Sequence, residues 1–137
     1  LPHFSHIHFF HLFMNLMSFI RVSLFLEEFF GPRRYIFLIF GIAIVSSFIN
    51  LMFSHLIFYI FNINYFYYSG ALGFSSVIFG LEFIYQKLTN RPQYIYGFFV
   101  KPEHVVWIQL IILSLVMRNT SFIGHLSGIL AGMLLTR

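Results

Sequence analysis

The chain has 137 residues, of which 59% are hydrophobic, 22% are aromatic and only 9% are charged. A soluble domain normally carries about 25% charged residues, so this chain has too little polar surface to cover itself in water. The composition argues against a soluble enzyme, a disordered segment and a nucleic-acid-binding module, and it favours a membrane protein with several spans. The absence of cysteine excludes disulfides and thiolate metal sites.

Runs without charged residues predict five membrane-spanning helices. Leu1 to Ile20 contains no Asp, Glu, Lys or Arg, and its apolar character resumes after Arg21 as far as Leu26. Residues 35–81 also lack charge, and their length is roughly double what one bilayer crossing needs, so they must contain two helices. A charged, Gly- and Pro-containing turn is expected at residues 27–34. The predicted helices are residues 1–26, 35–60, 73–88, 105–117 and 123–135.

The basic residues predict how these helices are oriented. An odd number of crossings places the two termini on opposite sides of the membrane. With the N-terminus outside, only Arg118 lies in an outer connection, and six other Lys and Arg residues face the cytoplasm. Those six are Arg33, Arg34, Lys87, Arg91, Lys101 and Arg137. The positive-inside rule therefore predicts a cytosolic C-terminus.

His11 and Asn15 interrupt the apolar run of the first helix. Residues four apart lie on one helical face, and both side chains can donate a hydrogen bond. Donors held together in a dry interior suit a developing oxyanion. Polar pairs also join helices in membrane bundles, and for this pair alone that interpretation is favoured.

Ser75 and Ser76 follow a loop of small residues, Gly70 to Gly73, and open the third predicted helix. The positive end of a helix dipole favours an alkoxide or oxyanion at such a hydroxyl. An ordinary helix N-cap is the simpler interpretation, because Ser is a preferred capping residue.

His125 begins a pattern in the last helix in which Gly128 and Gly132 share its face. Small residues at four-residue spacing let a neighbouring helix approach closely. Ser76 and Gly80 form a matching step on the third helix. We therefore expect these two helices to pack backbone to backbone and to bring a Ser hydroxyl within reach of the His125 ring.

These motifs and their order resemble the rhomboid family of intramembrane serine proteases over nearly the whole chain. His11-Leu-Phe-Met-Asn15 is similar to the family's HxxxN motif, and Gly73-Phe-Ser75-Ser76 is similar to its GxSG motif. The pattern of His125, Gly128 and Gly132 is similar to the motif of the family's last helix. Gly-Phe-Ser and residues 120–125 look most like the eukaryotic rhomboid-related branch of the endoplasmic reticulum, which implies that location.

The resemblance implies an activity and the residues that perform it. Ser75 would be the nucleophile and His125 the general base of a Ser-His dyad that cleaves transmembrane protein substrates within the lipid bilayer. His11 and Asn15, with the Ser75 backbone N–H, would hold the oxyanion. No cofactor, metal or nucleic acid is implied.

Two departures from the family pattern bear on this interpretation. The family core has six helices, so residues 1–137 would form a rhomboid-like transmembrane domain that lacks the first helix and its loop. Ser76 replaces the Gly that normally follows the nucleophile. Its side chain could crowd the last helix or compete for a hydrogen bond with His125.

Parts of the sequence also bear on three other functions. A catalytically inactive rhomboid-like protein that binds and routes membrane proteins would share this fold. A metal site is suggested by four histidines, but HExxH is absent and no acidic residue lies nearby. These histidines are His3, His6, His8 and His11. A channel or transporter is disfavoured because no inverted repeat is present and few charges lie in the helices.

Overall fold

The structure is a computed structural model that describes residues 2–62, 73–95, 97–116 and 122–137, with side chains from Phe9 onward. Its elements are α1 (Pro2–Phe30), α2 (Pro32–Phe61), α4 (Phe74–Thr89), β1 (Gln93–Ile95), β2 (Phe98–Val100), α5 (Pro102–Val116) and α6 (Phe122–Leu135). The predicted all-α bundle is confirmed, and each helix overlaps one of the five predicted segments.

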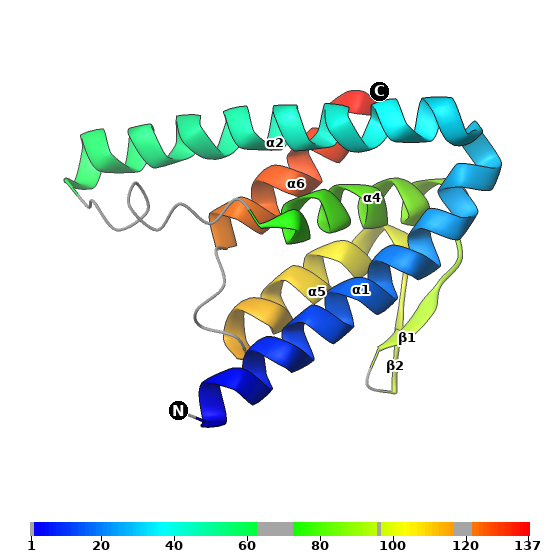
Figure 1. Ribbon diagram of the computed structural model, residues 1–137, viewed down its shortest axis with the longest axis horizontal. Coiled ribbons are helices and arrows are strands. Elements are labelled where there is room, and N and C mark those ends of the chain that lie inside the picture. Colours follow the sequence, from blue (N-terminus) through cyan, green and yellow to red (C-terminus); the bar gives the residue numbers. More distant parts are fainter. Residues whose placement is uncertain (1, 63–72, 96, 117–121) are drawn as a thin grey trace.

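Helix α4 is the central element of the bundle. It lies between α2 and α6 on one side and α1 and α5 on the other, and it contacts all four (Figure 1). Every residue from Ser76 to Glu82 is buried. A helix that is buried on all its faces is typical of the interior of a bundle. Residues on α4 therefore face every other helix of the described chain.

Glycines bring α4 and α6 into backbone contact. A Cβ added to Gly132 would lie 2.7 Å from the carbonyl oxygen of Gly80, and one added to Gly128 would collide with the carbonyl oxygen of Ser76. A Cβ on Gly80 would in turn lie 2.8 Å from the Gly128 carbonyl oxygen. Only glycine leaves room for this approach, which is the packing that the small-residue steps predict.

The outer surface of the bundle is apolar. Side chains such as Phe37 (77% exposed), Phe48 and Phe9 point away from the described chain. A continuous surface of this kind would aggregate in water but matches the hydrocarbon of a lipid bilayer. Within the described residues, α1 over Phe9–Phe30 and α2 over Pro32–Phe61 are both long and apolar enough to cross a membrane, whereas α5 and α6 are apolar but shorter.

The connection between α1 and α2 is shorter than the predicted turn. The first helix continues through Glu27 and Glu28 to Phe30, and the second begins at Pro32, so Gly31 alone separates them. Gly31 has φ +83°, a conformation that glycine adopts without strain. Pro32 fits the first position of a helix because the N–H that proline lacks would have no partner within the helix there. The charged residues lie in the helix ends rather than in a loop.

The connection between α4 and α5 contains a β hairpin that the sequence analysis missed. Strands β1 and β2 pair antiparallel, with Gln93 opposite Val100 and Ile95 opposite Phe98. Gly97, with φ +83°, lies in the turn between them. Figure 1 shows the hairpin projecting from the bundle. The aromatic and β-branched runs on either side of Gly97 were the available signal for it.

Replacing Gly128 by Ala tests the close approach of α4 and α6. The new Cβ would collide with the Ser76 carbonyl oxygen, so we expect the free energy of unfolding to fall by about 1–3 kcal/mol. Unfolding in mixed detergent micelles, followed by circular dichroism, measures this change. Gly41→Ala is the matched control, because its Cβ would make an ordinary contact at 3.4 Å with Leu135 Cδ1. Equal stability of the two variants would contradict the proposed packing.

Candidate active site

Ser75 lies in the first turn of α4. The helix begins after Gly73, which is the N-cap residue and makes no side-chain capping hydrogen bond. Ser75 is therefore not the cap, and the N-cap interpretation of its hydroxyl is wrong. The first N–H groups of a helix have no partner within the helix, and the helix dipole is positive there. Both features favour negative charge near Ser75.

His125 of α6 contacts Ser75 across fifty positions of sequence. Its Nε2 lies 3.0 Å from Ser75 Oγ, which is hydrogen-bonding distance. The His125 ring is 3% exposed and stacks on Phe79, with 4.7 Å between ring centroids. Its Nδ1 is buried and has no hydrogen-bond partner among the described residues. The structure therefore joins a hydroxyl and an imidazole, with no carboxylate behind the imidazole in the described chain.

His11 and Asn15 lie one turn apart on α1, as their spacing predicts. Asn15 Nδ2 is 3.4 Å from His11 Nε2, so the amide can donate to the imidazole when His11 carries its proton on Nδ1. An amide group has two hydrogens, and the second remains for another acceptor. The pair therefore offers at least one donor to a group bound nearby.

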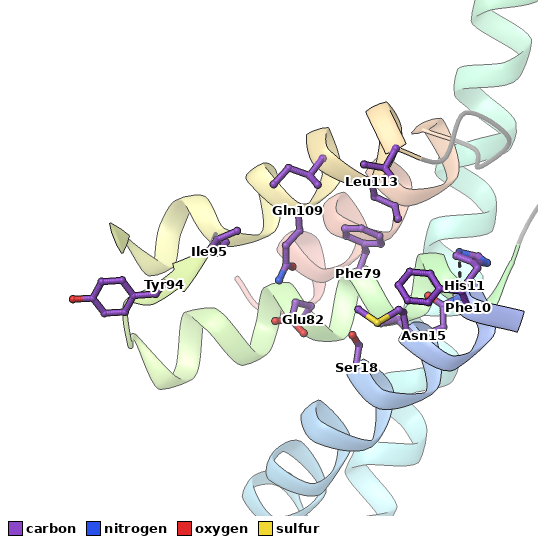
Figure 2. A pocket seen from close by; sticks show the side chains of 14 residues that line it. Phe10, His11, Asn15, Ser18, Phe79, Glu82, Tyr94, Ile95, Gln109 and Leu113 are labelled. Carbon is purple, nitrogen blue, oxygen red and sulfur yellow. Dashed lines mark hydrogen bonds between the residues drawn. The ribbon is translucent and has the colours of Figure 1, made fainter. Parts of the chain in front are cut away.

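A cavity of about 470 Å³ connects this pair with the middle of the bundle. His11 and Asn15 line one wall, Phe79 and Glu82 of α4 line another, and Gln109 belongs to α5. Figure 2 shows these side chains around the same space. Phe79 lines the cavity and stacks on the His125 ring, whereas Ser75 and His125 are not among the residues that line the cavity.

Ser76 does not interact with His125 in the way that its position suggested. Its hydroxyl donates to the Gly73 carbonyl oxygen at 3.1 Å, within the same turn. Its backbone, not its side chain, is the surface on which Gly128 packs. The Ser that replaces the family's Gly therefore neither blocks α6 nor takes the hydrogen bond of His125.

Sequence reasoning missed one polar contact in this region. Arg21 of α1 and Glu82 of α4 form an ion pair with Nη2–Oε distances of 2.8 and 2.9 Å. Each is a charged residue within an apolar run, and this is the signal that the sequence offers for the contact. The Glu82 carboxylate is directed to Arg21.

The metal interpretation gains no support from the described side chains, which contain no group of three His, Cys, Asp or Glu able to hold a metal ion. The side chains of His3, His6 and His8 lie outside the described ones.

Comparison with known proteins identifies the family. The rhomboid domain family matches residues 1–137. Rhomboid-like protein 14, mitochondrial, from Arabidopsis thaliana is 30% identical over 96% of the chain and 40% of its own length. Rhomboid-related protein 4 from Homo sapiens is 29% identical over 93% of the chain and 41% of its own length. No solved structure matches.

These matches show that the chain belongs to the rhomboid family, as the motifs predicted. Together with the apolar helices, membership makes it a membrane protein. The chain spans about two fifths of the length of these two curated relatives.

Ser76→Ala tests whether the departure from the family motif matters. Because the Ser76 hydroxyl bonds within its own helical turn, we expect this variant to keep the reactivity of Ser75 to within about twofold, the range of a near-neutral substitution. The rate at which a fluorophosphonate labels Ser75 measures it. A loss of labelling comparable to that in His125→Ala would show instead that Ser76 belongs to the reacting group.

Proposed function

We propose that this protein is an intramembrane serine protease that hydrolyses peptide bonds of transmembrane substrates with a Ser75–His125 dyad. The observation that carries the proposal is the 3.0 Å contact between Ser75 Oγ and His125 Nε2 in an apolar bundle. A hydroxyl is a weak nucleophile unless an adjacent base accepts its proton, and this distance allows that transfer. The His11–Asn15 pair on the neighbouring helix supports the same chemistry.

The first half of the reaction forms an acyl-enzyme. His125 Nε2 takes the Ser75 proton while Oγ attacks the substrate carbonyl carbon, and the carbonyl oxygen becomes an oxyanion. The Asn15 and His11 side chains and the Ser75 backbone N–H donate to that oxyanion. When the intermediate collapses, the C–N bond breaks, and the imidazolium gives its proton to the leaving amine.

The second half releases the acyl group. A water molecule attacks the ester carbonyl carbon, and its proton goes to His125. The second tetrahedral intermediate breaks the bond to Oγ, which recovers its proton from His125. Polar side chains on the cavity wall, among them His11, Asn15 and Gln109, provide hydrogen-bonding partners for this water.

The membrane arrangement is part of the proposal. Residues 1–137 act as a multi-pass rhomboid domain whose α6 ends on the cytosolic side, because six of the seven basic residues in the connections and tail then face the cytosol. The resemblance of the Gly73–Ser75 segment to the rhomboid-related branch favours the endoplasmic reticulum.

Ser75→Ala and His125→Ala test the dyad. Removing either member of a nucleophile–base pair should lower kcat for a reconstituted transmembrane substrate by about 10³-fold or more, because the two act as a unit. Cleavage in liposomes, followed by gel electrophoresis, measures it, and Ser114→Ala on α5 is the control. Cleavage by Ser75→Ala at the wild-type rate would remove the assigned nucleophile. A wild-type protein that captures substrates without cleaving them would favour a rhomboid-like protein that binds and routes membrane proteins.

Asn15→Ala tests the oxyanion donors. Loss of one such donor lowers kcat by about 10²–10³-fold with little change in KM, because the interaction is made only in the transition state. Kinetics with the same reconstituted substrate separate the two constants. Asn15→Asp, which has the same shape but an oxygen in place of the donor, should be equally impaired. If Asn15→Ala raises KM and leaves kcat unchanged, the pair binds substrate instead.

A further inference from the structure

The Arg21–Glu82 ion pair joins α1 and α4. One Arg21 nitrogen, Nη2, bonds both carboxylate oxygens of Glu82, and the residues are 61 positions apart in sequence. Glu82 is only 3% exposed, whereas the side chain of Arg21 is 43% exposed. Charged side chains within a membrane cost free energy and are rare, and those that occur usually have a function. We therefore expect the Arg21–Glu82 pair to have a function.

Neighbouring side chains hold the pair in one geometry. Gln86 Nε2 donates to Glu82 Oε1 at 3.0 Å, from one turn further along α4. The Arg21 guanidinium lies 5.2 Å from the centre of the Tyr85 ring, a distance typical of a cation–π contact. Phe25 packs edge-on against that same ring. The Glu82 carboxylate accepts from two donors, and the Arg21 guanidinium lies over an aromatic ring. Both groups therefore have little freedom to move.

The two partners belong to the two helices that carry the proposed reacting groups. Arg21 lies less than two turns beyond Asn15 on α1, and Glu82 lies about two turns beyond Ser75 on α4. Glu82 also lines the cavity wall near Asn15, and Figure 2 shows both around that space. Any slide or rotation of α1 against α4 would therefore move Asn15 relative to Ser75.

Apolar packing alone would only weakly fix the position of α1 relative to α4. The other described ring contact between these helices near the site is Phe19 against Phe74, with centroids 5.0 Å apart. Lipid tails are as apolar as Phe and Leu, so hydrophobicity gives no preference for one register of two helices in a bilayer. A charged hydrogen-bonded pair depends on direction as well as distance, so it favours one register of the two helices.

We propose that Arg21 and Glu82 are positioning residues that hold the oxyanion donors of α1 in register with Ser75 of α4. This inference rests on the proposed protease activity, in which the donors and the nucleophile must meet the same carbonyl group. A misplacement of about 1 Å at a reacting centre can lower a rate by about 100-fold.

Glu82→Gln in the complete protein tests the inference. The substitution keeps the shape of the side chain and removes its charge, and Arg21 is exposed enough to remain solvated or to reach the interface. We expect kcat for the reconstituted substrate to fall about 10- to 100-fold while KM stays within about twofold. Glu28→Gln, an exposed glutamate on α1 outside the pair, is the matched control and should cleave at the wild-type rate.

The reversed pair, Arg21→Glu with Glu82→Arg, shows whether pairing itself matters. It should recover kcat to within about tenfold of the wild type, whereas a role for either charge alone predicts no recovery. If the reversed protein does not fold, Arg21→Lys replaces it, since a lysine keeps the charge pair with fewer hydrogen bonds. The inference is overturned if kcat in the reversed protein, or in Arg21→Lys where that variant replaces it, is as low as in Glu82→Gln.

A spectroscopic readout separates this inference from the protease activity. Nuclear magnetic resonance of protein labelled with ¹⁵N at asparagine side chains reports the environment of the Asn15 amide, and Asn15→Asp assigns its signal. Glu82→Gln should shift this signal and Glu28→Gln should not. An unshifted signal with wild-type kcat contradicts the positioning role. If the wild type cleaves nothing, the proposed function fails, and an Asn15 signal that still shifts in Glu82→Gln supports the coupling of the two helices.

Discussion

Backbone contact between α4 and α6 is the constraint on which the site depends. The Ser76 carbonyl occupies the space that a side chain at position 128 would need, and Gly80 and Gly132 repeat the contact one turn further along. In a bilayer this close approach supplies packing energy that hydrophobicity does not. It also sets the distance between the helices that carry Ser75 and His125. A bulkier pair of surfaces would separate hydroxyl and imidazole beyond hydrogen-bonding range.

The few polar groups of this apolar chain divide into two tasks. Ser75 with His125, and Asn15 with His11, meet in pairs. Arg21, Glu82 and Gln86 instead bond to one another and leave the Glu82 carboxylate well satisfied. Gln86 Oε1 and His125 Nδ1 are buried without a hydrogen-bond partner among the described residues, which is costly in a hydrocarbon environment. We propose catalysis for the first set of polar groups and helix alignment for the second.

The sequence predicted the helices better than their ends and partners. Charge-free runs and the spacing of His125, Gly128 and Gly132 are local signals, and they indicated the bundle and the approach of its last helix. The break at Gly31 was placed too broadly because charges also occur at helix ends. The short hairpin around Gly97 lies between two predicted helices, where no strand was predicted. The Arg21–Glu82 pair could not be predicted, because it depends on how two distant helices rotate against each other.

Fluorophosphonate labelling followed by mapping of the modified peptide tests the central claim most directly. A hydroxyl activated by a neighbouring imidazole reacts with such a probe, whereas an ordinary serine does not. The account predicts an adduct on Ser75 in the reconstituted wild-type protein and its loss in His125→Ala. An unmodified Ser75 in a folded wild-type protein, or equal labelling in the two proteins, would contradict the claim that His125 activates Ser75.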